Sequence, residues 1–181
     1  RAYIEKKLEE KAVIYGLTTG FGKFANVVIS HEQTAELQRN LIISHTCAMG
    51  NPYPVHVVRA AMLLRANALS RGNSGIRLET LQTLIDMLNA GIHPVIPEKG
   101  SLGASGDLAP LSHIALGLIG EGKVEYKGQT VSAKEAMAAE GITPVVLAAK
   151  EGLALNNGTQ MMTAVGVNVL WDAMKLQKVA D

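Results

Sequence analysis

Three consecutive small residues, Ala104, Ser105 and Gly106, carry the strongest chemical signal in the sequence. Alanine supplies an unhindered carbonyl, serine a β-hydroxyl that can be eliminated, and glycine an unobstructed nitrogen on a backbone that bends sharply. Attack of the Gly106 nitrogen on the Ala104 carbonyl, with loss of two waters, would give 4-methylidene-imidazole-5-one (MIO). This ring is an electrophile that no unmodified side chain provides. A tight turn before a helix is the alternative interpretation of the same residues.

Other glycine-rich stretches fit nucleotide or acyl chemistry poorly. Residues 16–23 resemble a phosphate loop, but the glycine spacing is one residue too long, and Phe24 stands where a hydroxyl would be needed for Mg²⁺. No strand and crossover pattern surrounds the glycines of residues 20–22, as a dinucleotide site would require. A hydrolase using Ser105 and His113 is a poor candidate. The nucleophile elbow of hydrolases has the pattern Gly-x-Ser-x-Gly, and Asp107 stands where its last glycine would be.

Composition narrows the class of protein further. The 181 residues carry a formal charge of +1, with 48% hydrophobic and 18% charged residues. This balance predicts a globular chain and argues against broad attraction to nucleic acid or anionic membranes. The sequence contains no run of about 18 apolar residues and no secretion signal, so we expect a cytoplasmic location. Its single cysteine, Cys47, is expected to be a small buried hydrophobe.

Periodicity and turn residues predict a mainly α-helical fold. Helices are expected over residues 1–12, 31–47, 55–71, 81–91, 107–118 and 132–140, and after residue 157. Ser30, Asp107 and Ser132 are the expected N-caps, and Gly91 stands where a helix stops. In the helix over 55–71 the apolar residues share one face, which places Arg59 and Arg65 off that face.

One small hairpin is the only convincing β-structure in the sequence. Residues 123–126 and 129–131 flank Lys127 and Gly128, a typical turn pair. No βαβ alternation and no internal repeat is visible. The sequence starts without Met and the last helix lacks a stop signal, so we expect a part of a longer protein.

Four motifs together resemble the aromatic amino acid ammonia-lyases and aminomutases, and histidine ammonia-lyases most of all. They are GSLGASGDLAPL at residues 100–111, YGLTTGFG at 15–22, Ser44-His45, and LNNGTQ at 155–160. Their order and spacing agree with the family over nearly the whole chain. The resemblance implies the N-terminal portion of a helical ammonia-lyase fold, with an α-helical domain over 1–98 and the MIO loop and start of a central bundle over 99–181.

The resemblance also implies roles for individual residues. Ala104, Ser105 and Gly106 would be the precursor of MIO, and Asp107 would support cyclisation besides capping the helix that follows. Tyr15 matches the catalytic tyrosine that removes the β-proton. A phenol ordinarily has a pKa of about 10, so this role requires a shifted or deprotonated hydroxyl.

Two further residues would contact the substrate. Asn157 matches the asparagine that holds the substrate amine or the oxygen of the electrophile. His45 would set specificity, because family members that act on histidine or tyrosine carry His there, and an imidazole can hydrogen-bond a polar ring. The remaining histidines (His31, His56, His93 and His113) are interpreted as structural, since their spacings suggest no metal site.

The expected function is elimination of ammonia from L-histidine to give urocanate, with MIO as the cofactor and neither metal nor nucleotide. A homotetramer is implied, with no nucleic-acid or membrane partner. The later part of family members supplies a second tyrosine, an arginine and a glutamate, so the 181 residues alone are expected to be inactive. A tyrosine ammonia-lyase, an aminomutase and a non-catalytic helical assembly module remain as alternatives.

Overall fold

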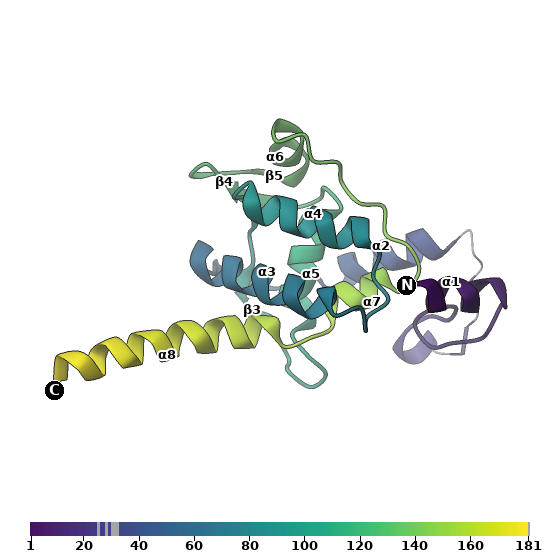
Figure 1. The fold of residues 1–181 in the computed structure, drawn as a ribbon, viewed down its shortest axis with the longest axis horizontal. Coiled ribbons are helices and arrows are strands. Elements are labelled where there is room, and N and C mark those ends of the chain that lie inside the picture. The colour runs from purple at the N-terminus through teal and green to yellow at the C-terminus, as the bar shows by residue number, and fades with distance from the viewer. Residues whose placement is uncertain (25, 28, 30–32, 181) are drawn as a thin grey trace.

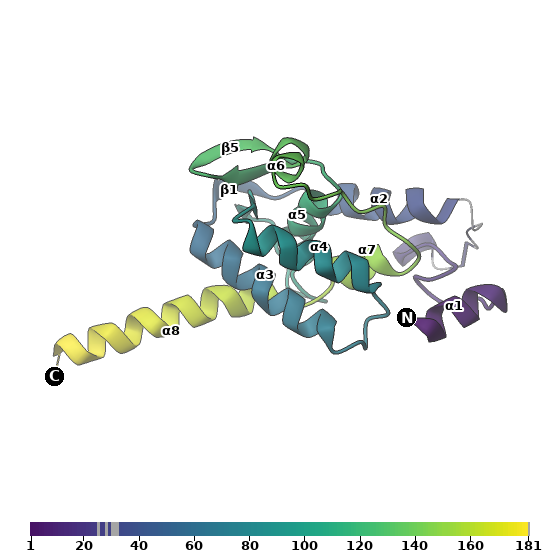
Figure 2. The ribbon, with the colours of Figure 1, turned by 45° about the horizontal axis from the view of Figure 1, so that its top comes forward.

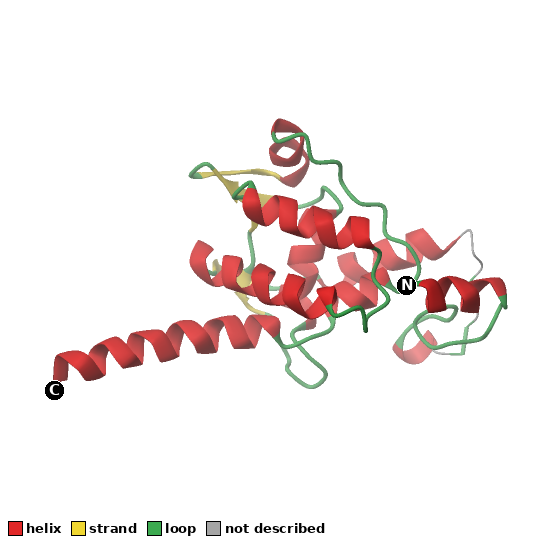
Figure 3. Cartoon of the chain, in the orientation of Figure 1, coloured by secondary structure: helices red, strands yellow, loops and turns green. Residues whose placement is uncertain are grey.

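Helices dominate the computed structural model, which describes residues 1–24, 26–27, 29 and 33–180 (Figures 1 and 3). The prediction of a mainly α-helical fold is confirmed. The helices are α1 (Ala2–Glu9), α2 (Thr34–His45), α3 (Val55–Ser70), α4 (Leu78–Asn89), α5 (Leu108–Leu118), α6 (Ala133–Ala139), α7 (Glu151–Asn156) and α8 (Gln160–Ala180), with a short 3₁₀ turn, η1 (Gly22–Phe24). The expected cap Ser30 lies outside the described residues.

The core forms where α3, α4 and α5 pack side by side (Figures 1 and 2). Leu84 on α4 and Leu111 on α5 are fully buried, and the neighbours at helical spacing around them are buried or half-buried. The predicted apolar faces of these two helices are therefore confirmed. Core residues come from both sides of position 98, so one hydrophobic cluster holds the chain together.

The hairpin forms as predicted, between β4 (Lys123–Tyr126) and β5 (Gln129–Ser132). Lys127 and Gly128 have φ of +50° and +78°, which matches a tight turn with two left-handed residues. Ser132 then caps α6 through a capping box with Glu135. Gly91, with φ of +71°, follows the end of α4 as expected.

The expectation that only this hairpin would be β-structure is wrong. β2 (His93–Pro94) adds to β4, and β1 (Met49–Pro52) pairs with β3 (Pro97–Lys99). These strands are two to four residues long and contain proline. They lack the alternation that marks a strand in sequence, and their partners lie about 30 or more residues away, so only the fold reveals them.

Two predictions of burial are also wrong. Arg65 is 4% exposed, because the helix α3 turns it toward acceptors at the end of α7. Cys47 is exposed in the segment that leads from α2 to β1.

The long helix expected after Asn157 is confirmed as α8, which extends away from the body of the molecule (Figures 1 and 2). Only Met161 and Ala164, near its start, are buried, where α8 packs against α3. Much of its remaining apolar surface is exposed, including Val167, Leu170 and Trp171. No helix in the described ranges has the length and apolarity that crossing a membrane would take.

Candidate active site

The Ala-Ser-Gly segment lies in the loop that joins β3 to α5. This loop projects from the body of the molecule beside the start of α8 (Figure 1). Ala104 and Ser105 are exposed, and Gly106 is partly covered with φ of +129°, a conformation that L side chains rarely adopt. Gly100 at the start of the loop packs so closely on Ala48 that an added Cβ would lie 2.7 Å from the Ala48 Cβ. The start of the loop is therefore held against Ala48, while Ala104 and Ser105 remain exposed.

Asn157 and the loop are in direct contact. A Cβ added at Gly106 would lie 3.1 Å from Asn157 Oδ1 and 2.8 Å from the Gly158 carbonyl oxygen. The backbone N–H of Asp107 donates to that same carbonyl at 2.6 Å. Only glycine fits this approach at position 106, so the residue type there follows from the contact as well as from any cyclisation.

Asp107 stands at the N-cap position of α5, as predicted, but its side chain makes no capping hydrogen bond. The carboxylate is 3% exposed and accepts instead from Ser101 Oγ at 2.9 Å and from the backbone N–H of Met162 at 2.8 Å. It thus gives a hydrogen-bond acceptor to a backbone amide that has no partner within α8. The amide lies in the first turn of that helix, where a negative charge is favourable. The expected capping role is corrected to one of joining the loop to α8.

Tyr15 lies in the loop between α1 and η1 and is 56% exposed. Its ring packs edge-on against Phe21 with centroids 6.2 Å apart, and its hydroxyl accepts from the Gly22 N–H at 3.4 Å. The adjacent Gly16, with φ of +67°, leaves only 3.0 Å between an added Cβ and Leu153 of α7. The tyrosine loop therefore rests on the helix that ends at Asn156 and leads into Asn157.

His45 is the last residue of α2, and its Nδ1 lies 2.8 Å from the Leu41 carbonyl oxygen. A carbonyl can only accept, so we assign the ring proton to Nδ1. The neutral ring then presents Nε2 as an acceptor. This tautomer suits a partner that donates, such as the N–H of an imidazole or the O–H of a phenol.

The helix α7 links these motifs. Gly152 N–H donates to Gln38 Oε1 on α2 at 2.8 Å, which couples α7 to the helix that carries His45. At its start, the buried Glu151 accepts from Arg77, Thr80 and the backbone of Ala148. Burial alone would raise the pKa of this carboxyl, but the hydrogen bonds outweigh it and hold the pKa below its ordinary value.

The structure thus brings Asn157, Asp107 and the 104–106 loop together directly. Tyr15 and His45 lie on segments packed around the same helix, and no hydrogen bond joins either to the loop within the described residues. None of the sequence motifs includes Arg65, which hydrogen-bonds to the end of α7. The signal was present, since Val58, Met62, Arg65 and Leu69 follow one stripe of α3 and all four are buried.

A buried polar group at the end of α7 leads to a prediction about stability. Asn156 is fully buried, and neither its Oδ1 nor its Nδ2 has a hydrogen-bond partner in the described part of the chain. Replacing it by leucine, Asn156→Leu, removes two unpaired polar atoms at similar volume. We expect the free energy of unfolding to rise by about 1 to 3 kcal/mol.

The urea-unfolding midpoint of the longer protein that carries this segment measures the change. Asn67→Leu, at an exposed position on α3, is the matched control and should change stability by less than about 0.5 kcal/mol. A lower midpoint for Asn156→Leu would show that the amide has partners in the assembled protein.

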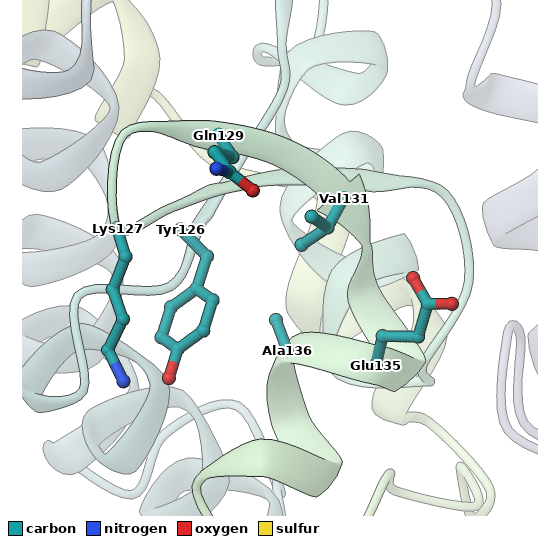
Figure 4. A pocket seen from close by; sticks show the side chains of 6 residues that line it. All are labelled: Tyr126, Lys127, Gln129, Val131, Glu135 and Ala136. Carbon is teal, nitrogen blue, oxygen red and sulfur yellow. The ribbon is translucent and has the colours of Figure 1, made fainter.

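Another cluster of polar side chains within the described residues lies beside the hairpin. A surface hollow of about 380 Å³ lies between the hairpin and α6 (Figure 4). Tyr126 and Lys127 sit side by side at its edge, and both hydrogen-bond Glu140. No group of three or more His, Cys, Asp or Glu side chains within the described ranges could hold a metal ion.

Solved structures match this arrangement over almost the whole chain. Histidine ammonia-lyase from Trypanosoma cruzi aligns with a TM-score of 0.89 and 42% identity, covering 97% of this chain and 34% of that one. The phenylalanine aminomutase of Pantoea agglomerans aligns with a TM-score of 0.90 and 43% identity, covering 96% and 33%. The fold is therefore of the helical ammonia-lyase class.

The chain belongs to the aromatic amino acid lyase family, whose model matches residues 1–181. Histidine ammonia-lyase from Alkaliphilus oremlandii is 65% identical over 181 residues, and that from Alkaliphilus metalliredigens is 61% identical. The match covers 100% of this chain but 36% of each of these relatives. The chain thus spans about a third of the length of the curated relatives it matches, and the family resemblance seen in the sequence is confirmed.

Proposed function

We propose that this chain acts as a segment of a longer histidine ammonia-lyase, which converts L-histidine to urocanate and ammonia. The observation that carries the proposal is the contact of Asn157 with Gly106, in a loop whose Ala104 and Ser105 are exposed. The identity of 65% to a histidine ammonia-lyase supports the choice of substrate. The proposal includes a cytoplasmic homotetramer, for which the exposed apolar surface of α8 offers an interface.

The residues present fit formation of MIO from Ala104, Ser105 and Gly106. Gly106 has the backbone freedom that ring closure needs, and the exposed Ser105 can release its hydroxyl. The group, once formed, supplies the electrophile that makes a weakly acidic β-proton removable. Asp107 holds the C-terminal end of the loop through Ser101 and Met162.

The side chains of this segment divide the remaining tasks. Tyr15 takes the proton from Cβ, Asn157 holds the substrate amine or the oxygen of the electrophile, and His45 Nε2 accepts a hydrogen bond from the substrate ring. The Cβ–H and Cα–N bonds break, a carbon–carbon double bond forms, and ammonia leaves. Residues of the longer polypeptide complete the site, so the 181 residues alone should not turn over histidine.

A second candidate is a tyrosine ammonia-lyase or an aminomutase. Solved aminomutases share this fold, among them a tyrosine aminomutase from Streptomyces globisporus with a TM-score of 0.85 and 44% identity. The acceptor at His45 Nε2 suits a phenol as well as an imidazole. Product analysis separates the candidates, because a lyase releases ammonia and an aminomutase returns it to Cβ. A non-catalytic assembly module would turn over neither histidine nor tyrosine.

Specificity at position 45 tests the proposal. In the longer protein, we expect histidine to have the highest kcat/KM among histidine, tyrosine and phenylalanine. His45→Phe leaves a ring N–H of histidine unpaired, which costs about 1 to 3 kcal/mol, or roughly tenfold to a hundredfold in kcat/KM. Phenylalanine should lose nothing, because a phenyl ring has no polar atom to pair.

The matched control is His56→Phe, at an exposed position of α3, which should leave the three values of kcat/KM unchanged. Parallel loss for all three substrates in His45→Phe would assign that residue to folding or general catalysis. A preference of the unaltered protein for tyrosine would select the second candidate.

A further inference from the structure

Arg65 reaches from the middle of α3 to the turn that carries Asn157. Its Nη2 donates to the carbonyl oxygens of Ala154 and of Asn157, the latter at 3.0 Å, and its Nη1 donates to Gln160 Oε1 at 2.7 Å. One guanidinium thereby holds the last turn of α7, the turn itself and the first residue of α8. The fork of donors in arginine suits such a set of acceptors, whereas a lysine ammonium is a single point of contact.

Arg65 is buried, which is unusual for a cationic side chain. It is 4% exposed, and no ion pair to it occurs among the residues that the structure describes. Burial lowers its pKa to about 10, which still leaves it protonated at neutral pH. The last carbonyls of α7 have no partners within the helix and carry partial negative charge, so they compensate the buried cation.

An anion mirrors this arrangement on the other side of the turn. Asp107 accepts from the Met162 N–H in the first turn of α8, while its own N–H donates to Gly158. Gly158 lies between the two charges, since a Cβ added there would collide with Arg65 Nη1 and Gln160 Oε1. The turn over residues 157–160 is therefore held by a cation at the end of one helix and an anion at the start of the next.

We propose that Arg65 is a positioning residue, which fixes Asn157 against Gly106 and thereby supports loop cyclisation and turnover. The inference rests on the proposed function, because it assigns to Asn157 the role given above. It adds a residue from α3, a helix that contributes none of the motif residues. Arg65 itself touches neither the loop nor the substrate in this assignment, and acts through the backbone of Asn157.

The test uses Arg65→Met and Arg65→Lys in the longer protein, with Arg71→Met as the control. Arg71 is an exposed arginine at the end of the same helix. For each, the cyclised fraction is measured from the mass of the peptide that contains residues 104–106, and kcat and KM for histidine are measured on folded protein. A displacement of about 1 Å in a catalytic group costs on the order of a hundredfold, which is the drop expected in kcat per cyclised site for Arg65→Met.

Arg65→Lys keeps the charge and should restore part of the loss, leaving kcat per cyclised site about tenfold below that of the unaltered protein. Arg71→Met should match the unaltered protein in every quantity. Wild-type kcat and cyclised fraction in folded Arg65→Met would overturn the proposal. Should Arg65→Met fail to fold, Arg65→Lys decides alone, and wild-type values in it would overturn the proposal equally. An unaltered protein that neither cyclises nor turns over histidine would instead contradict the proposed function, whatever the variants do.

Discussion

Ser105→Ala is expected to prevent the two-water mass deficit of the loop and to abolish almost all turnover of the longer protein. In the unaltered protein, the peptide containing residues 104–106 should weigh less than its sequence by two waters. Alanine has no β-hydroxyl to eliminate, so the second water cannot leave and no electrophilic double bond can form. Loss of the covalent centre should lower kcat by at least about a thousandfold.

Peptide mass spectrometry and a urocanate assay measure the two effects. Leu102→Ala is a matched control in the same loop, since Leu102 is 91% exposed and should be dispensable for the mass deficit and turnover. An active, unaltered protein whose loop peptide has its full sequence mass would refute the electrophile. An active Ser105→Ala variant would do the same.

Tyr15→Phe should lower kcat by about a hundredfold to ten-thousandfold and leave the loop cyclised. The variant removes only the hydroxyl, which is the group assigned to take the β-proton. The hydrogen bond that this hydroxyl accepts from Gly22 is long, at 3.4 Å, and its ring contact with Phe21 does not need the oxygen. Folding should therefore be little affected.

The measurement pairs kcat for histidine with the cyclised fraction of the same sample. Tyr3→Phe, at an exposed tyrosine of α1, controls for loss of a hydroxyl in the N-terminal segment and should retain full activity. If the cyclised fraction falls together with kcat in Tyr15→Phe, then Tyr15 acts in forming the site, and a different group must take the proton.

Local sequence determined the hairpin and the α-helices of the described residues other than α7, which the sequence patterns did not predict. The face of α4 follows from leucines at helical spacing, and the start of α6 from Ser132 and Glu135 three residues apart. The turn at Lys127 and Gly128 follows from residues that accept positive φ. Each of these sequence signals lies within a few residues of the structure it produces, so the local sequence is enough to predict that structure.

The candidate site was also visible in sequence, because its residues lie in short motifs. The roles of Tyr15, His45 and Asn157 came from the order of those motifs along the chain, and they remain predictions. The sequence showed that Gly106 could bend. Only the fold showed that Asn157 lies against it, since the two residues are separated by α5, the hairpin, α6 and α7.

Tertiary structure alone decided the partners of the charged residues and of the short strands. Asp107 had the type and place of a helix cap, but a fixed amide of α8 offered its carboxylate a better partner than its own helix did. Arg65 had the spacing of a core residue and the charge of a surface one, and the carbonyls at the end of α7 resolved that conflict in favour of burial. The pairing of β1 with β3 depended on a neighbour far along the chain. In each case the deciding atoms came from another segment, and an unpaired polar group in the interior costs more free energy than local preference can offset.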